Sequence, residues 1–311
     1  MLLSSDGSTA VSNLGWVDKG SLWILSVGDL SLGMVKLGES AYLRLRMGTD
    51  DCFTAQHGGR ERFDRFEVTV HHLSDPAAVL ARVSLEGAEA TFQGDTTAWA
   101  RAPVWYVDYF RLPASAEYRL FRIDATTRRV EHQDFAWYTP QRYDVGYQGV
   151  IGVTAIPGDH RLLVSVQRSS TLVLHDPEAR AEAGAVTLAD RGGNPTVHFL
   201  RTRPEAWADD YDTVVRLDAR TLRVRDKATL QSAAGNVRQF VGALAFDEGE
   251  HRCVVARPYS GDIAVLDVAR FKVVGRVGVG GQPLDVALAR DGRVFARDWK
   301  TGELRVGQFR A

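Results

Sequence analysis

The sequence predicts an all-β protein assembled from one repeated four-stranded unit. Short runs rich in Val, Leu, Ile, Phe, Tyr and Thr are broken by Gly, Asp, Asn and Pro, which is typical of strands joined by tight turns. Residues 262–267 (DIAVLD), 272–279 (KVVGRVGV) and 284–289 (LDVALA) are the clearest such runs. Helical periodicity is weak, and no run approaches the ~18 apolar residues of a membrane helix.

The strand pattern repeats along the chain. Residues 236–280 contain four expected strands (VGALAF, CVVARP, DIAVLDV and KVVGRVGV), and the cycle restarts at Gln282. A repeat of this length and strand number predicts a seven-bladed β-propeller with four-stranded antiparallel blades, folded as a single domain over 1–311. The last unit stops after its third strand, so the blade is either short or borrows a strand from the N-terminus. The expected blades are 1–38, 39–87, 88–145, 146–190, 191–235, 236–280 and 281–311.

One stretch, GDIAVLDVARFKVVGRVGVGGQPLDVALARDGRVFARD (261–298), resembles the repeat of YVTN-type seven-bladed propellers. The resemblance is good over about 236–311, weaker over 148–190 and only architectural over 1–147. Arg257 and Asp298 stand where that family usually has Asn. The resemblance implies the fold and says little about chemistry, because the family includes binding subunits and is similar in fold to lactonases and streptogramin lyases.

Composition narrows the functional classes. The chain has 38 Lys and Arg against 39 Asp and Glu, a net charge of −1, so nucleic acid and membrane partners are not expected. Its two cysteines, Cys52 and Cys253, are too few for a secreted disulfide scaffold and stand near the start of equivalent strands. The first residues do not read as a signal peptide, which gives a cytoplasmic location as the expectation.

The expected turns between second and third strands carry more than turn residues. Tight turns need Gly, Asn, Asp or Ser, whereas aromatic and arginine side chains are enriched where a surface recognises a partner. The alternative is that these side chains pack between blades, with Arg–Asp pairs tying the loops together. The candidate ligand-binding residues in these turns are Trp16, Arg111, Arg168, Asp210, Tyr211, Arg257, Tyr259, Asp298 and Trp299.

The densest aromatic stretch is 135–148 (FAWYTPQRYDVGYQ), between the third and fourth units. It is longer than a tight connection needs, so it can cover the channel mouth with rings that stack on a ligand. A loop that bridges two blades with its rings buried explains the composition equally well. Its candidate ligand-binding residues are Trp137, Arg142, Tyr143 and Gln148.

His57 and Asp108 are the candidate catalytic residues. Both are expected at the ends of second strands in adjacent blades, where they would point into the same funnel. Histidine transfers protons near neutral pH, and the carboxylate would orient it. We expect Arg142, Arg168, Arg257 and Asp298 to converge on the same end of the channel. His198, on an inner strand, is interpreted as a core histidine.

Metal and nucleophile motifs are missing from the sequence, which contains no GxSxG, HExxH or CxxC. Asp209, Asp210 and Asp212 offer oxygen ligands for a divalent cation, but a solvated acidic turn is the favoured interpretation. No cofactor is predicted.

The function predicted from these features is binding of a small polar or aromatic molecule in the central funnel. The molecule bound in the funnel would then be the substrate of an enzyme with lyase, isomerase or lactonase-like hydrolase chemistry. An enzyme is favoured by the sequence but is not established by it. The alternative is a protein–protein interaction scaffold that uses the same loop face. The sequence does not indicate the oligomeric state.

Overall fold

The structure is a computed structural model, and it describes part of the chain. For the strands between residues 41 and 136, and for 150–153 and 155, only the backbone is described. The described residues are 1–4, 6–12, 21–36, 41–45, 51–57, 66–72, 75–85, 98–101, 104–110, 117–124, 130–136, 150–156, 158–166, 169–189, 193, 195–200, 203–230, 240–247 and 249–310.

The described strands form seven antiparallel sheets, a number consistent with the seven predicted blades. The first sheet contains β1 (Leu2–Leu3), β2 (Thr9–Ser12), β3 (Ser21–Ser26) and β4 (Leu32–Lys36). The second contains β5 (Ala41–Leu45), β6 (Asp51–His57), β7 (Phe66–His72) and β8 (Asp75–Leu85). The third contains β9 (Ala98–Arg101), β10 (Val104–Phe110), β11 (Glu117–Asp124) and β12 (Val130–Ala136).

The remaining sheets follow in chain order. The fourth contains β13 (Val150–Ala155), β14 (Leu162–Val166), β15 (Thr171–Asp176) and β16 (Ala181–Thr187). The fifth contains β17 (Thr196–Phe199), β18 (Glu205–Asp210), β19 (Thr213–Asp218) and β20 (Val224–Thr229). The sixth contains β21 (Leu244–Phe246), β22 (Arg252–Arg257), β23 (Asp262–Asp267) and β24 (Lys272–Gly278). The seventh contains β25 (Pro283–Leu288), β26 (Arg293–Asp298) and β27 (Leu304–Gln308).

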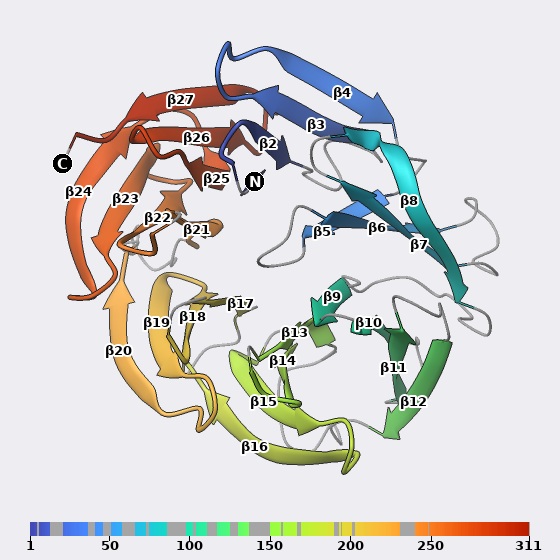
Figure 1. The fold of residues 1–311 in the computed structure, drawn as a ribbon. Coiled ribbons are helices and arrows are strands. Elements are labelled where there is room, and N and C mark those ends of the chain that lie inside the picture. The colour runs from blue at the N-terminus through green and yellow to red at the C-terminus, as the bar shows by residue number, and fades with distance from the viewer. Residues whose placement is uncertain are drawn as a thin grey trace.

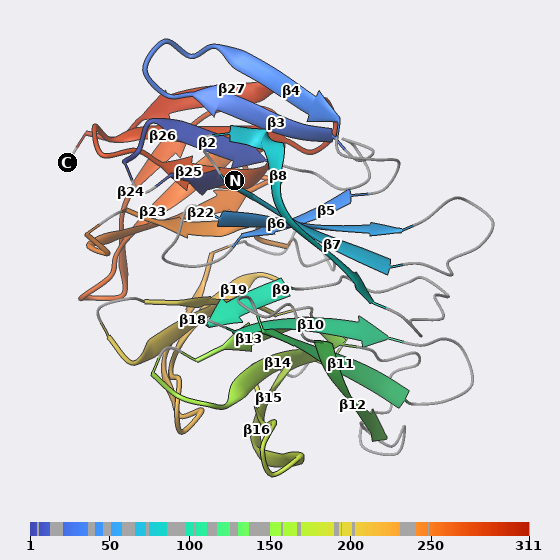
Figure 2. The same ribbon diagram turned by 45° about the vertical axis from the view of Figure 1, so that its right-hand side comes forward.

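The sheets are arranged around a common axis, which makes the molecule a β-propeller (Figure 1). The first strand of each sheet lies toward the centre and the last lies at the outer margin, as the turned view also shows (Figure 2). No helix occurs in the part of the chain that the structure describes. In the same part, no helix is long and apolar enough to cross a membrane.

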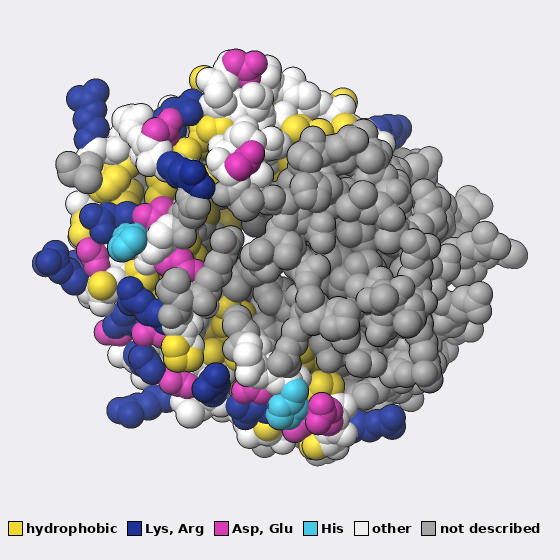
Figure 3. All heavy atoms as spheres, in the orientation of Figure 1, with side chains coloured by type: hydrophobic (Ala, Val, Ile, Leu, Met, Phe, Trp, Pro, Cys, Tyr) yellow, Lys and Arg dark blue, Asp and Glu magenta, His cyan; other side chains and the backbone are white. Residues whose placement is uncertain are grey.

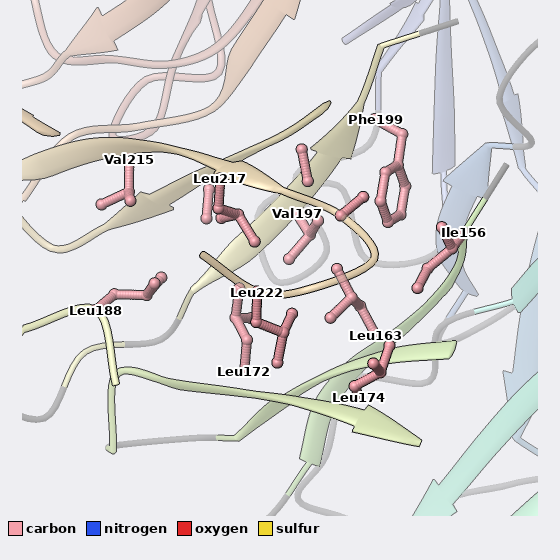
Figure 4. Close-up of a cluster of buried hydrophobic side chains, with 13 residues drawn as sticks. Ile156, Leu163, Leu172, Leu174, Leu188, Val197, Phe199, Val215, Leu217 and Leu222 are labelled. Atoms are coloured by element: carbon pink, nitrogen blue, oxygen red, sulfur yellow. The ribbon is translucent and has the colours of Figure 1, made fainter. Parts of the chain in front are cut away.

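Apolar side chains fill the space between neighbouring sheets. Between the fourth and fifth sheets, Leu172 and Leu174 of β15 pack with Val215 and Leu217 of β19 (Figure 4). Because strand side chains alternate between faces, the opposite faces of these sheets pack against the next neighbours. Trp207, on the other face of the fifth sheet, packs with Phe246 and Phe271 of the sixth sheet.

Aspartates end several third strands and organise the turn that follows. The Asp218 carboxylate accepts hydrogen bonds from the backbone N–H groups of Arg220 and Thr221, both at 3.1 Å. Leu222 then takes a left-handed conformation with φ of 58°. Asp267 accepts from Arg270 N–H at 2.8 Å in the same way. These are the local hydrogen bonds expected of Asp in turns, so these aspartates have structural roles.

The seam of the ring lies between the first and seventh sheets. The N-terminal strands pair among themselves, and the seventh sheet has three strands within the described chain. The Ser12 hydroxyl donates to Asp285 Oδ2 at 2.6 Å, and Arg297 Nη1 lies 3.4 Å from the same hydroxyl. The Arg297 guanidinium also covers the Trp23 ring at 5.3 Å. The Met1 ammonium also contacts Asp285. Within the described residues the first and seventh sheets share no strand, and these contacts join them.

Candidate functional site

The turns between second and third strands lie on one face of the ring, together with the connections between successive sheets. Antiparallel order in every sheet requires this, because the second and fourth strands end on the same side. Backbone hydrogen bonds join the two kinds of segment: Val241 N donates to Tyr211 O at 2.5 Å, and Trp299 N donates to Gln282 O at 3.1 Å. We call this surface the turn face; its described members are 169–170, 211–212, 240–243, 257–261, 279–282 and 298–302.

Three aromatic side chains meet on the turn face between the sixth and seventh sheets. The ring of Phe240 stands edge-on to the rings of Tyr259 and Trp299, with centroids 5.3 and 6.1 Å away. The Trp299 indole N–H donates to Gln282 Oε1. Edge-to-face contacts of this kind fix the orientation of the rings. The structure therefore brings together two of the predicted ligand-binding residues, Tyr259 and Trp299, and joins them through Phe240.

Tyr211 extends this aromatic surface toward the fifth sheet. It occupies the turn between β18 and β19 in a left-handed conformation with φ of 54°. Ser170, in the equivalent turn of the fourth sheet, has the same conformation, so the conformation belongs to the geometry of the turn. The hydrogen bond from Val241 ties the Tyr211 backbone to the segment that carries Phe240.

Arg257 is held inside its own turn. Its side chain is buried, Nη1 donates to Asp262 Oδ2 at 3.2 Å, and Nη2 donates to Ser260 Oγ at 3.0 Å. Burial lowers the pKa of this guanidinium, and the charge of Asp262 opposes that effect. The arrangement matches the alternative interpretation of these arginines, in which an Arg–Asp pair ties a loop together.

The carboxylate of Asp298 is also hydrogen-bonded to the residues around it. Its carboxylate accepts hydrogen bonds from the backbone N–H groups of Gln282, Lys300 and Thr301 at 2.6, 2.9 and 3.0 Å. Burial alone would raise the pKa of Asp298, but these donors and the nearby charge of Arg305 outweigh it and lower the pKa. Asp298 therefore joins the turn to the connection before its sheet.

Asp210 occupies the equivalent place in the fifth sheet without such donors. Within the described residues, both carboxylate oxygens are buried and neither has a hydrogen-bond partner of ordinary geometry. Burial raises its pKa to about 6, and Asp212 adds to the rise, while the Ser170 hydroxyl and Lys227 oppose it. Ser170 Oγ itself accepts a hydrogen bond from Gly193 N at 2.7 Å. Asp210 is thus enclosed by its neighbours and does not face the solvent.

A glycine makes room for the aspartate in both sheets. A Cβ atom at Gly193 would overlap the carboxylate of Asp210, and one at Gly281 would overlap that of Asp298. The two Gly–Asp pairs are separated by the same number of residues along the chain. The fifth and seventh sheets therefore share this glycine–aspartate contact. Within the described residues they differ in the number of backbone N–H groups that donate to the carboxylate.

Asp209 and Asp210 of the ADDYD segment lie on opposite sides of their strand. Asp209 accepts a hydrogen bond from Thr196 N at 3.1 Å, while Asp210 faces Gly193 on the other side of the strand. Burial raises the pKa of Asp209 to about 7. Among the described residues, no group of three or more His, Cys, Asp and Glu side chains is arranged to hold a metal ion.

His198 lies on the inner strand β17, opposite Trp207. Burial lowers its pKa to about 4, so the imidazole is neutral at physiological pH. Its Nε2 atom is buried and has no hydrogen-bond partner in the described part of the chain.

The two candidate catalytic residues belong to sheets whose backbone alone is described. His57 is the last residue of β6 and pairs with Phe66. Asp108 lies inside β10, opposite Leu120, and not at the end of the strand as expected. Both strands are second strands, in neighbouring sheets. Whether the two side chains meet stays a prediction.

Other predicted positions lie outside the described residues. They include the rest of the aromatic stretch beyond β12, which ends at Ala136. The predicted convergence on one end of the channel therefore stays a prediction for these residues. They are Trp16, Arg111, Trp137, Arg142, Tyr143, Gln148 and Arg168.

Sequence reasoning missed two residues of the turn face, Phe240 and Gln282. Both belong to connections between sheets, which topology places beside the second-to-third-strand turns. The sequence contained a signal for Phe240, because a connection between sheets does not need an aromatic residue in order to turn.

Comparison with known proteins supports the fold and leaves the family open. No protein-family model matches the chain, and no curated protein matches its sequence. The YVTN resemblance therefore stays a prediction. Solved structures do match: the β-propeller domain of Cps50 (Swd1) from Myceliophteria thermophila has a TM-score of 0.71 at 12% identity, over 99% of this chain and 95% of that one.

Two further solved structures are similar over nearly the whole chain. A chain of the Mitotic Checkpoint Complex has a TM-score of 0.67 at 10% identity, covering 99% of this chain and 86% of that one. Kuenenia stuttgartiensis hydrazine synthase has a TM-score of 0.69 at 12% identity, covering 99% and 94%. At these identities the likeness shows the β-propeller fold and nothing about chemistry.

Proposed function

We propose that this protein is an interaction platform that binds a partner protein through the turn face. The observation that carries the proposal is the exposure of Tyr211 and Tyr259, which leave 41% and 48% of their surface accessible on neighbouring turns of one face. Tyrosine combines a large apolar ring with a polar tip, and it is enriched among the residues that dominate binding energy.

The polar groups of the turn face support the same proposal. Arg257 binds within its own turn, and Asp298 binds its own turn and the connection at Gln282. Both groups therefore hold the surface in shape instead of presenting charges to a small ligand. Phe240 supports Tyr259 and Trp299 from the side. A preorganised aromatic surface loses little entropy on binding, which favours a broad and shallow contact.

A second candidate function is binding of a small polar or aromatic molecule in the central channel, with lyase, isomerase or hydrolase chemistry. The observation that favours it is the pair of perturbed groups on inner strands of the fifth sheet. Burial raises the pKa of Asp209 to about 7 and lowers that of His198 to about 4. Such perturbed groups cluster at functional sites. The fold accommodates both candidates, since one similar structure is a checkpoint complex and another is an enzyme.

Site-specific photo-crosslinking tests the interaction platform. A benzophenone amino acid placed at residue 211 or 259 and irradiated in cells of the source species should give a discrete protein adduct. The matched controls are Val224 and Val274, which have 40% and 42% exposed surface but lie on outer strands away from the turn face, and they should give none. With the adduct identified, Tyr259→Ala should weaken its binding by about tenfold or more without lowering the melting temperature.

Two results would count against the interaction platform. Equal adducts at the turn face and at the control strands would contradict the platform. A small-molecule adduct in the native mass spectrum of the purified protein, lost on Asp209→Asn or His198→Gln, would establish the second candidate in its place.

A further inference from the structure

Asp209 lies where the fifth sheet meets the turn face, next to the inner strand β17. It is the last residue but one of β18 and pairs with Thr196, the first residue of β17, which borders the centre of the ring (Figure 1). Strand alternation places its side chain on the same face of the sheet as Trp207, which packs toward the sixth sheet. Asp209 and Thr196 both keep part of their surface accessible, so a ligand can reach the carboxylate.

The charge of Asp209 is not balanced by a cation. Its Oδ1 atom accepts a hydrogen bond from Thr196 N–H at 3.1 Å, and no Lys, Arg or His of the described chain forms an ion pair with it. Burial raises the pKa of Asp209 to about 7, and the charge of Asp210 adds to the rise. Asp298, by contrast, is compensated by three backbone N–H groups. The ionised form of Asp209 would be stabilised by a cation bound beside it.

His198 adds a second polar group on the same face. It stands two residues after Thr196 on β17, which places its side chain diagonally opposite Asp209. Burial lowers its pKa to about 4, and the Met1 ammonium adds to the fall, so the neutral ring does not supply the missing charge. Its buried Nε2 atom has no hydrogen-bond partner among the described residues. We call Asp209, Thr196 and His198 the inner corner.

The inner corner is a set of hydrogen-bond acceptors. A carboxylate only accepts, a threonine hydroxyl can accept, and Nε2 of a neutral histidine accepts when the proton is on Nδ1. Ammonium and guanidinium groups match such a set, because they carry a positive charge and several N–H donors but no acceptor. A neutral ligand would leave the carboxylate charge uncompensated, and an anion would be repelled by it.

Aromatic rings lie next to the inner corner. Tyr211 follows Asp209 by two residues and is 41% exposed, and its backbone carbonyl accepts a hydrogen bond from Val241, the neighbour of Phe240. The face of an aromatic ring attracts a cation, and the ring also packs against the aliphatic stem of Lys or Arg. A basic side chain that enters from the turn face can therefore contact a ring with its stem and Asp209 with its charge.

We propose that the inner corner binds one lysine or arginine side chain of the protein partner that covers the turn face. The proposal rests on the interaction platform and adds the chemistry of its partner, a basic side chain beside an apolar surface. The carboxylate of Asp209 pairs with the cation, while Thr196 and His198 accept its remaining N–H groups. A partner's side chain is favoured over a free amine, because a protein bound to the exposed ring of Tyr211 brings its side chain to Asp209 in the same contact.

Small model compounds test the cation site by itself. N-acetyl-arginine methylamide and N-acetyl-citrulline methylamide have nearly the same shape and differ in charge. Titrated into the ¹⁵N-labelled protein, the arginine compound should shift the amide signal of Thr196 at millimolar concentration, and the citrulline compound should bind at least about fivefold more weakly. Asp209→Asn removes the charge at constant shape and should weaken the arginine compound by a similar factor.

Asp291→Asn is the matched control for this titration. Asp291 is an exposed carboxylate in the turn between β25 and β26, at the opposite end of its sheet from the turn face, so its loss should leave the affinity unchanged. Asp209→Asn should not lower the melting temperature, because an amide is less costly to bury than a carboxylate without a cation. Equal binding of the two compounds, or arginine affinity that survives Asp209→Asn, would overturn the cation site.

The partner captured by crosslinking at residue 211 or 259 tests the source of the cation. Asp209→Asn should weaken its binding at least about fivefold, and exchange of one Lys or Arg of the partner for Gln should remove that sensitivity. A captured partner that binds Asp209→Asn as tightly as wild type would contradict this inference and leave the interaction platform standing. An arginine compound that binds at Asp209 although neither position gives a protein adduct would assign the site to a free small-molecule cation and overturn the partner as its source.

Discussion

At the scale of single residues, Asp210 and Asp298 show how one residue type at equivalent positions acquires opposite properties. Each carboxylate lies against a glycine of the preceding connection. Asp298 receives three backbone N–H groups, and its pKa falls. Asp210 receives none from the described residues, and burial raises its pKa to about 6. The count of donors around a buried carboxylate therefore decides whether its charge stabilises or destabilises the fold.

Asp210→Asn tests this difference through the pH dependence of stability. The carboxyl titrates near 3.8 when unfolded and near 6 when folded, so the wild-type protein loses free energy of unfolding as pH rises through this window. The amide cannot ionise and avoids that loss. Chemical denaturation should find the variant no more stable than wild type near pH 4, and more stable by up to about 3 kcal/mol at pH 8.

Asp298→Asn is the matched control, with the opposite sign. The folded pKa of Asp298 is lowered, so its charge stabilises the protein above the unfolded pKa, and the benefit is lost as pH falls through the folded pKa. The variant should therefore be less stable than wild type at pH 8, by a margin that narrows in acid. Parallel stability profiles for the two variants would contradict the role assigned to burial at Asp210.

The sequence identified these residues but not their surroundings. It placed Arg257, Asp298, Tyr211 and Tyr259 in turns between second and third strands, because repeat spacing fixes where strands end. It left open whether a polar side chain at a strand end faces a ligand or turns back on its own loop. That choice depends on contacts with another part of the chain, such as the one between Asp298 and Gln282.

At the scale of elements, the sheets are held together by side chains that alternate along each strand. β18 shows this, because Ala206 and Ala208 pack toward the fourth sheet while Trp207 packs toward the sixth. Strand alternation was visible in the sequence and predicted the sheets well. The depth of Trp207 was not visible, since the segment AWADDYD reads as a short polar strand, and its burial depends on the rings of Phe246 and Phe271.

Trp207→Ala should be strongly destabilising. The indole is fully buried and contacts aromatic rings of the sixth sheet at centroid distances of 5.4 and 4.7 Å. Removing it leaves a cavity that the sheets cannot refill, which lowers the free energy of unfolding by about 3–5 kcal/mol. Trp207→Phe retains a ring and should lose less than half as much. Denaturant titration of both variants checks the order, and equal losses would show that packing against the sixth sheet is unimportant.

At the scale of the whole molecule, the ring is closed at the seam between the first and seventh sheets. An apolar cluster there includes Leu25 and Phe295, and Arg297 contacts the hydroxyl of Ser12 at 3.4 Å and the ring of Trp23 across the seam. Charged side chains of both signs are interspersed at the outer margin of the described part, in keeping with the near-zero net charge (Figure 3).

A double-mutant cycle measures the seam directly. Arg297→Met and Trp23→Leu each remove one side of the cation–π contact while keeping an apolar side chain in place. The free energies of unfolding should show a coupling of about 1 kcal/mol between the two positions. The same cycle between Arg297 and Val224, which lies in the fifth sheet, should be additive within about 0.5 kcal/mol. Additivity at the seam would show that the contact does not hold the ring closed.

Closure through side chains also determines how the molecule responds to force. Where a strand is shared between the ends of a ring, pulling on those ends loads a row of backbone hydrogen bonds in shear. Here the ladder of β2 belongs wholly to the first sheet and that of β26 to the seventh. Among the described residues, side chains such as Ser12, Asp285 and Arg297 cross between them, together with the contact of the Met1 ammonium with Asp285. Handles attached at the two ends should therefore part the seam at low tension and leave the individual sheets intact, so that the ring opens into an arc before any sheet unravels.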